Sequence, residues 1–326
     1  MNIKKLCVIV FAISSVLTSC SKGSDAPGNG GNNNGGGGDN GGNNSSLGTG
    51  HIYVQWADEG VKDIDLQTAA ESTLLPNTTG LHSYYISQDG TKILQSSTAS
   101  GTDYDANLYT LTNLDGSIIQ QFKYYPAEGD YTFPQLSPDA TMIAVPPTFD
   151  DGVVIMNTSG KVLYNFATIN GNKVNGGIDW LPNNELLIST SAGIWHIGSP
   201  FKTAYFITKP NFASWGDIAA SPDGKKIAFT GGSHIWIMDI DGTNLKQVTT
   251  SSTVEAYPVF SPDSKSLLVG TDYQETLATS YIWYLGIIPA DGNTYNVDPG
   301  KDTNVVEVIP KGETQPQPGD DYMYWR

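Results

Sequence analysis

Residues 221–242 read SPDGKKIAFTGGSHIWIMDIDG, and this stretch decides the fold. Its opening Ser-Pro-Asp-Gly favours a reverse turn, because proline pre-sets φ, the aspartate side chain bonds nearby backbone and glycine adopts the left-handed conformation. Two β-type runs follow, Lys226–Phe229 and Ile235–Ile240, and a second turn comes at Asp241-Gly242. With one strand before the first turn and one after the second, the stretch predicts four consecutive strands.

Weaker copies of the first turn recur along the chain. They begin at Ser87, Ser137, Leu181 and Ser261, so that successive first turns stand 40 to 50 residues apart. The second turn recurs at Asp115-Gly116, Ser159-Gly160 and Asp291-Gly292. A four-stranded antiparallel unit repeated at this interval is typical of a propeller blade, with strands A to D and turns at A–B and C–D.

The two ends of the repeat region supply a sixth blade. His51–Ala57, Val61–Leu66 and Glu71–Pro76 resemble strands B, C and D without an A strand. Tyr322–Arg326 resembles an A strand without its B, with Trp325 where Phe260 stands before Ser261. We therefore predict an all-β, six-bladed propeller over residues 51–326, closed by pairing of the N- and C-terminal strands, which removes exposed sheet edges.

The order Ser-Pro-Asp-Gly, Lys-Ile-Ala-Phe and Ile-Trp-Ile-Met-Asp resembles the TolB-like (PD40, WD40-like) propeller family over roughly residues 51–326. TolB carries an α/β domain before its propeller, and this chain has a Gly/Asn-rich stretch there instead. The role of TolB in the Tol–Pal envelope system is therefore not transferred to this chain. The family also resembles oligogalacturonate lyase in fold, but that enzyme class needs a histidine-rich metal site. The four histidines of this chain are scattered over four predicted blades: His51, His82, His196 and His234.

The first twenty residues have the order of an export signal. Lys4 and Lys5 precede the apolar run Leu6–Val16, which is too short for a membrane span but suits a signal peptide. Leu17-Thr18-Ser19-Cys20 then resembles the lipobox of bacterial lipoproteins. The resemblance implies that residues 1–19 are removed and that Cys20 is lipidated. A simple secretory signal with a chance cysteine is the alternative.

Sorting signals favour the outer membrane of a Gram-negative, Bacteroidota-like bacterium, because Ser21 rather than aspartate follows Cys20. Whether the protein faces the periplasm or the cell surface stays open. Residues 20–50 are predicted to be a disordered tether, since residues 28–44 consist mainly of glycine and asparagine. We expect the lipid on Cys20 to be the contact with the membrane and the protein to be a monomer.

Composition excludes one class of partner. The chain has 33 acidic and 17 basic residues, a formal net charge of −16, and Arg326 as its only arginine. Nucleic-acid binding requires a basic face, so nucleic acid is not an expected partner.

One face of a propeller carries the D–A connections and B–C loops, and we call it the loop face. The distance from the first to the second turn indicates B–C insertions in blades 2 and 6, at Thr102–Asp105 and Thr271–Gln274. Between them blade 1 offers aromatic and acidic residues, which suit protein contacts or sugar stacking. The alternative is that these insertions are surface loops without a function, rich in Asp and Tyr because they form turns. The predicted loop-face site comprises Trp56, Asp58, Asp103, Tyr104, Asp105, Asp272 and Tyr273.

The mouth of the central channel is a second candidate site. Residues four to six positions before each A–B turn should surround the axis, and carboxylates gathered there would attract a cation or a basic peptide segment. The alternative is that the aromatic residues pack between blades and the acids are hydrated. The predicted residues are His82, Tyr131, Trp215, Asp217, Glu255, Tyr257 and Asp321.

The sequence contains no Gly-x-Ser-x-Gly elbow, phosphate loop or dinucleotide fingerprint. We therefore expect a non-catalytic binding module that docks a protein of the cell envelope. We expect no cofactor, apart from a structural cation at the channel mouth. A glycan-binding accessory lipoprotein is the alternative. A polysaccharide lyase or hydrolase that uses Asp217 and Glu255 is a third reading.

Overall fold

In the computed structural model, the described residues are 46–326, except 79, 100–104, 127–130, 148–151 and 276–280. The chain divides into two units, Met1–Gly41 and Gly42–Arg326, and all described residues belong to the second. The predicted signal peptide and residues 20–45 of the predicted tether, Cys20 among them, thus lie outside the described residues. Residues 46–50 of that tether are ordered on blade 1, where the Leu47 N–H donates to the Leu66 carbonyl (2.7 Å) and the Thr49 carbonyl accepts from Trp325 Nε1 (2.9 Å).

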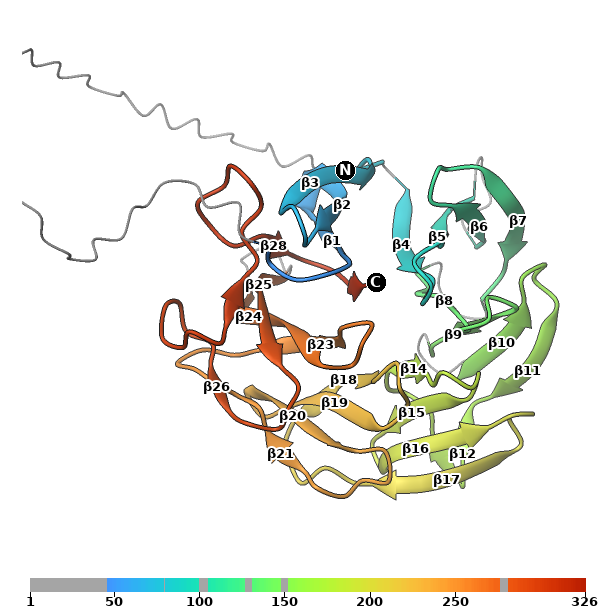
Figure 1. The fold of residues 1–326 in the computed structure, drawn as a ribbon. Coiled ribbons are helices and arrows are strands. Elements are labelled where there is room, and N and C mark those ends of the chain that lie inside the picture. The colour runs from blue at the N-terminus through green and yellow to red at the C-terminus, as the bar shows by residue number, and fades with distance from the viewer. Residues whose placement is uncertain (1–45, 79, 100–104, 127–130, 148–151, 276–280) are drawn as a thin grey trace, which may run out of the picture. The chain divides into compact units, whose positions relative to one another are not determined.

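The described part of the second unit forms six blades arranged around a central axis (Figure 1). Each blade is an antiparallel sheet whose four strands lie side by side in the order A to D. Blade 1 consists of β29 (Met323–Trp325), β1 (His51–Trp56), β2 (Gly60–Asp65) and β3 (Ala70–Leu75). Blade 2 consists of β4 (Leu81–Ile86), β5 (Lys92–Thr98), β6 (Asn107–Asn113) and β7 (Ile118–Tyr124). Blade 3 consists of β8 (Gln135–Leu136), β9 (Met142–Val145), β10 (Val153–Asn157) and β11 (Val162–Phe166).

Blade 4 consists of β14 (Ile178–Trp180), β15 (Leu186–Thr190), β16 (Gly193–Gly198) and β17 (Thr203–Thr208). Blade 5 consists of β18 (Trp215–Ala220), β19 (Lys226–Gly231), β20 (His234–Asp239) and β21 (Lys246–Gln247). Blade 6 consists of β23 (Ala256–Phe260), β24 (Ser266–Glu275), β25 (Tyr281–Pro289) and β27 (Val306–Glu307), with β28 (Pro318–Gly319) also paired to β25. The predicted fold class is confirmed.

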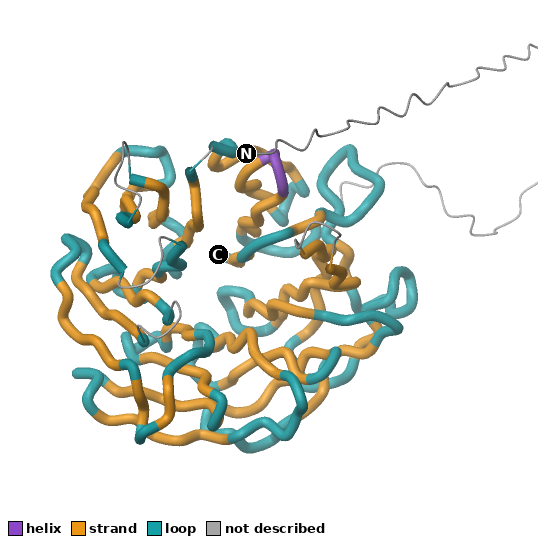
Figure 2. Tube along the Cα trace, turned by 180° about the vertical axis from the view of Figure 1, so that it is seen from behind, coloured by secondary structure: helices purple, strands orange, loops and turns teal. Residues whose placement is uncertain are grey.

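Short elements outside the blades complete the described residues. Two small pairs connect neighbouring segments: β12 (Thr168–Ile169) with β13 (Asn172–Lys173), and β22 (Thr249–Thr250) with β26 (Tyr295–Asn296). The one helix of the described residues is the 3₁₀ turn η1 (Ala57–Glu59) between β1 and β2, drawn purple in Figure 2. Apart from it, strands and loops make up the described residues.

The ring closes through blade 1, as predicted from the two ends of the repeat region. Strand β29 pairs antiparallel with β1 in the register Ile52↔Trp325, Tyr53↔Tyr324 and Val54↔Met323. Blade 1 therefore combines strands from opposite ends of the described chain. It stands between blades 6 and 2 and completes the ring (Figure 1).

The Ser-Pro-Asp turns hold the A and B strands together by local bonds. The hydroxyl of Ser221 donates to Asp223 Oδ1 (2.7 Å) and accepts from the backbone N–H groups of Lys225 (3.1 Å) and Lys226 (2.8 Å). Gly224 has a φ of +70°, which glycine adopts without strain. The serines at the other three Ser turns, Ser87, Ser137 and Ser261, are likewise buried and bonded to the aspartate two residues on.

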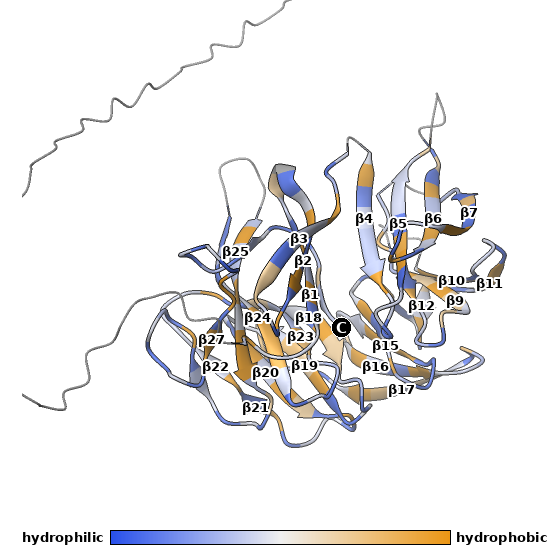
Figure 3. Ribbon diagram, turned by 45° about the horizontal axis from the view of Figure 1, so that its top comes forward, coloured by the Kyte–Doolittle hydropathy of each residue, from blue (hydrophilic) through white to orange (hydrophobic). Residues whose placement is uncertain are grey.

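The core lies within and between the blades, where apolar side chains of successive sheets meet. Figure 3 shows the hydrophobic residues concentrated along the strands. Trp180, Trp283, Tyr109 and Phe229 are the largest fully buried side chains. The packing of one blade on the next fixes where the A strands stand around the axis, and this positions the site described below.

Candidate functional site

A cavity of about 500 Å³ lies where the A strands of the blades converge, and we call it the axial pocket. Its lining residues on the A strands form two tiers, which stand at two distances before the A–B turn. The lower tier stands two positions before each A–B turn or its blade 1 equivalent: Tyr85, Gln135, Asp179, Ala219, Val259 and Tyr324. The upper tier stands four positions before it, nearer the loop face: Gly177, Asp217, Tyr257 and Tyr322. Trp215 also lines the pocket.

Bulges set the side chains of the upper tier. The pairing of β18 with β19 shifts register between Gly216 and Ala219, and that of β23 with β24 shifts between Ala256 and Val259. Asp217 and Tyr257 occupy equivalent places in these bulges, with φ of 49° and 53°. A bulge bends its strand and re-aims a side chain, and both residues line the pocket.

The upper tier is acidic and aromatic. Asp217 accepts a hydrogen bond from Thr230 Oγ1 (2.8 Å); solvent reaches its side chain, yet protein surrounds it closely enough that desolvation raises its pKa. Burial raises the pKa of Asp321, whose Oδ1 accepts from the Tyr322 N–H (2.8 Å), to about 6. Burial and the charges of these two aspartates raise the pKa of both Tyr257 and Tyr322. The four side chains are thus electrostatic neighbours.

The lower tier contains an acid and the one arginine. Asp179 accepts hydrogen bonds from the N–H groups of Ala220 (2.7 Å) and Trp180 (2.9 Å), and burial raises its pKa to about 6. The Arg326 guanidinium donates to the carbonyls of Ile86 and Ser87 and lies over the rings of Tyr85 and Tyr324. Its charge favours the ionised form of Asp179, whereas no such influence is found at Asp217 or Asp321.

Three of the seven residues predicted for the channel mouth line the axial pocket, and the charge of a fourth acts on its tyrosines. Trp215, Asp217 and Tyr257 line the axial pocket, and Asp321 is the electrostatic neighbour of Tyr257 and Tyr322. His82 and Tyr131 lie elsewhere. The His82 ring is buried in blade 2, within hydrogen-bond distance of Thr98 Oγ1 (2.8 Å) and Asn107 Oδ1 (3.3 Å). The exposed ring of Tyr131 stacks on it at 4.3 Å.

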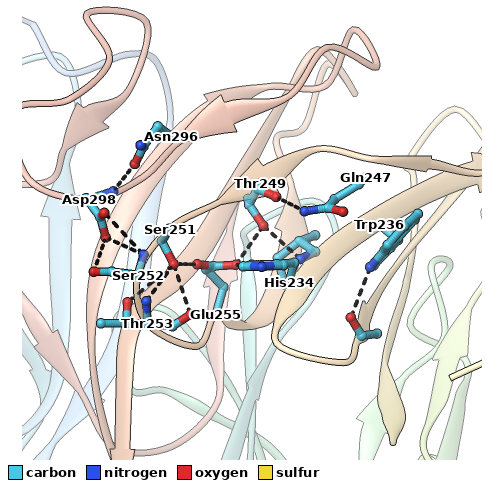
Figure 4. Close-up of polar contacts among 12 residues, drawn as sticks. His234, Trp236, Gln247, Thr249, Ser251, Ser252, Thr253, Glu255, Asn296 and Asp298 are labelled. Atoms are coloured by element: carbon cyan, nitrogen blue, oxygen red, sulfur yellow. Dashed lines mark hydrogen bonds and ion pairs between the residues drawn. The ribbon is translucent and has the colours of Figure 1, made fainter. Parts of the chain in front are cut away.

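The prediction that Glu255 faces the channel mouth is corrected, because its side chain is fully buried between blades 5 and 6 (Figure 4). One carboxylate oxygen lies 2.7 Å from His234 Nδ1 and accepts from Thr249 Oγ1 (2.8 Å). The other accepts from Ser251 Oγ. Ser252, next in the chain, donates to Asp298. Both oxygens of Glu255 are engaged, so the carboxylate is structural.

The predicted loop-face insertion of blade 6 is a lengthened hairpin of β24 and β25 rather than a loop, with a bulge between Thr271 and Gln274. Asp272 and Tyr273 lie in this strand. The Tyr273 ring is half-buried and stacks on Tyr281 (5.3 Å) and on Trp283 (6.0 Å).

The rest of the predicted loop-face site is only partly visible. Asp103, Tyr104 and the side chain of Asp58 lie outside the described residues. Trp56 is half-buried and Asp105 is exposed. The Ala57 N–H donates to Asp320 Oδ2 (2.8 Å), which ties the blade 1 connection to the segment next to Asp321.

Sequence reasoning missed Asp179, Tyr322, Tyr324 and Arg326. For Asp179 and Tyr324 a signal was present in the repeat, because both stand two positions before a first turn or its blade 1 equivalent, whereas the prediction used positions four to six before it. The blade at 172–208 also has the most degraded turn, Leu181-Pro182-Asn183-Asn184, which obscured Asp179.

Two kinds of feature are absent from the described residues. No group of three or more His, Cys, Asp or Glu side chains is placed to hold a metal ion there. Nor does that part of the chain contain a helix of the length and hydrophobicity that a membrane span requires.

The raised pKa of Asp321 gives a testable pH dependence. The folded state binds this proton more tightly than the unfolded state, so Asp321 lowers the free energy of unfolding as pH rises from about 4 to above 6. We expect Asp321→Asn to stabilise the protein by about 2 kcal/mol at pH 7.5 and to have little effect at pH 4. Urea unfolding of both proteins at the two pH values checks this. Equal differences at both pH values would contradict it.

Comparison with solved structures supports the fold. A protein from Agrobacterium tumefaciens, named as a TolB candidate, aligns with a TM-score of 0.57 and 15% identity over 86% of this chain and 99% of its own. TolB from Acinetobacter baumannii aligns with a TM-score of 0.55 and 19% identity over 74% of this chain and 62% of its own, so this chain spans less than two thirds of that protein. An oligogalacturonate lyase from Vibrio parahaemolyticus reaches a TM-score of 0.48 at 10% identity, covering 68% of this chain and 71% of its own.

No protein-family model and no curated protein sequence matches the chain. At these identities the structural likeness establishes the TolB-like propeller fold and leaves the activity to be argued from the site.

Proposed function

We propose that this TolB-like propeller is a non-catalytic binding module of the cell envelope that docks a protein partner on its loop face. In this proposal the lipid on Cys20 anchors the protein to the outer membrane, and the part of the predicted tether that precedes Ser46 gives the propeller freedom to reach its partner. Such a chain of about thirty residues has a root-mean-square reach of roughly 30 Å.

The observation that carries the proposal is the axial pocket. All six blades contribute to its lower tier, and its upper tier presents Asp217, Tyr257 and Tyr322 towards the loop face. The blade 1 connection joins this surface through the Ala57–Asp320 hydrogen bond. Tyrosine and tryptophan side chains gathered at one recess are features of a protein-binding hot spot.

Crosslinking in intact cells tests the proposal. The variants are Trp56→Ala and Tyr281→Ala on the loop-face connections of blades 1 and 6, and the control is Tyr205→Ala on the outer strand β17, where the ring is 58% exposed. We expect one dominant envelope protein to be captured by wild type and by the control, and several-fold less of it by the loop-face variants. Capture that is equal in all four proteins would contradict docking on this face.

A glycan ligand is the second candidate, and the Tyr273–Tyr281 stack favours it. Tyr281 is 41% exposed and its partner ring lies almost parallel to it, at 17°. Exposed rings of this kind suit stacking on sugar faces. Binding to a polysaccharide panel that Tyr281→Ala abolishes would favour the glycan reading. A lyase or hydrolase would require turnover that depends on Asp217, because Glu255 is enclosed by its own partners.

A further inference from the structure

Resting on the proposed docking function, we infer that the upper tier of the axial pocket is a binding site for an organic cation, namely an ammonium or guanidinium group. The residues that would hold it are Asp217, Tyr257, Tyr322 and Trp215, which line the pocket, and the charge of Asp321 acts on both tyrosines. They come from blades 5 and 6 and from the segment that enters blade 1.

The charge balance of the pocket carries the first step. Surrounding protein raises the pKa of both Asp217 and Asp321, although solvent still reaches the Asp217 side chain, and within the described residues neither forms an ion pair with a lysine or arginine. The pocket's arginine, Arg326, is held at the lower tier by backbone carbonyls and the rings of Tyr85 and Tyr324. Desolvated carboxylates without a fixed cation gain free energy from a cationic ligand.

The aromatic walls carry the second step. Tyr257 and Tyr322 are electrostatic neighbours of both aspartates, and Trp215 lines the same pocket. The faces of Tyr and Trp rings attract ammonium and guanidinium groups, and this attraction is stronger where water is excluded. Carboxylates and aromatic rings in one recess therefore select a cation with an organic body over a neutral solute.

A bare metal ion fits less well than an organic cation, because the described residues contain no group of three or more His, Cys, Asp or Glu side chains placed to hold one. The volume of about 500 Å³ is within the range of small-ligand pockets and can take a lysine or arginine side chain or a free polyamine. These two sources share the same cationic chemistry, and the experiment below separates them.

Isothermal titration of the full chain in a non-ionic detergent tests the inference. The probes are N-acetyl-lysine methylamide for a peptide side chain, putrescine for a free amine, and two neutral compounds, N-acetyl-norleucine methylamide and cellobiose. We expect at least one of the cations to bind and the neutral compounds not to bind. A preference for the lysine derivative would indicate a partner's side chain, and a preference for putrescine a free amine.

Variants identify the site. We expect Asp217→Asn to weaken cation binding by at least about tenfold, since a charge-assisted contact is lost. Asp321→Asn provides a second, independent reading of the same pocket. The matched control is Glu275→Gln, an exposed carboxylate on the blade 6 hairpin, which should leave binding within about twofold. Cation binding should also weaken between pH 7.5 and pH 5 as the carboxyls become protonated.

Binding of the neutral compounds, absence of cation binding, or cation binding that both Asp→Asn variants retain would overturn the inference. Failure of the proposed function has a different signature. Cations that bind without any envelope protein being crosslinked would refute docking but not the cation site. A captured protein whose yield is unchanged in Asp217→Asn would support docking and refute the cation site as its basis.

Discussion

Replacing Trp325 with alanine is expected to lower the free energy of unfolding by about 3–5 kcal/mol, the range for removing a large aromatic side chain from a core. Trp325 is 4% exposed and packs in the core cluster shared by blades 1 and 6. Its indole Nε1–H donates to the Thr49 carbonyl at 2.9 Å. The substitution removes this bond and leaves a cavity in the strand that closes the ring.

Urea unfolding followed by circular dichroism measures the loss for Trp325→Ala. The matched control is Tyr205→Ala on β17, an aromatic residue on an outer strand that is 58% exposed. That control should change the free energy of unfolding by less than about 1 kcal/mol. A loss below about 1 kcal/mol for Trp325→Ala would show that strand β29 does not contribute to closure as the structure indicates.

Replacing Glu255 with alanine should destabilise the protein by about 3–5 kcal/mol, because removing this buried carboxylate leaves several hydrogen-bond partners unsatisfied. Alanine would leave the His234 ring, the Thr249 hydroxyl and the Ser251 hydroxyl without their shared acceptor (Figure 4). The network joins strand β20 of blade 5 to the segment that enters blade 6. Its loss therefore loosens the contact between the two blades.

Two control variants accompany the Glu255 prediction: one removes only the charge of Glu255, and the other removes a carboxylate at an exposed position. Glu255→Gln preserves the size of the side chain and one acceptor, so its effect should be smaller, about 1–2 kcal/mol. Glu275→Ala removes an exposed carboxylate and should change stability by less than about 0.5 kcal/mol. Thermal and urea unfolding measure all three. Equal effects of Glu255→Ala and Glu275→Ala would contradict a structural role for Glu255.

The architecture was predictable from the sequence because its signals are local. The Ser-Pro-Asp turns close through bonds between residues at most five positions apart, as at Ser221, Asp223 and Lys226. The same chemistry at Ser87, Ser137 and Ser261 set the repeat length and hence the blades. Closure followed from the same repeat, since an unpaired A strand at one end matched a blade without one at the other.

The site was predictable only in part. Asp217 and Tyr257 were found because their spacing from the next turn is the same in blades 5 and 6. Glu255 stands six positions before its turn, as Trp215 does, but whether a side chain faces the axis or the neighbouring blade depends on packing. Glu255 faces His234 and Thr249 instead. Burial of a carboxylate in a satisfied network leaves no pattern in the sequence.

By itself, then, the sequence determined the turns, the four-stranded repeat, the number of blades and their closure, because each depends on residues adjacent in the chain or on a periodic count. Only the tertiary structure decided which side chains meet on the axis. Asp217, Tyr257 and Asp321 belong to three separate segments, and the bulges in β18 and β23 help to bring them together. The physical reason is that the pocket forms only when the ring closes and its blades meet at the axis. No single blade contains all the acidic and aromatic side chains that line it or the protein that surrounds them.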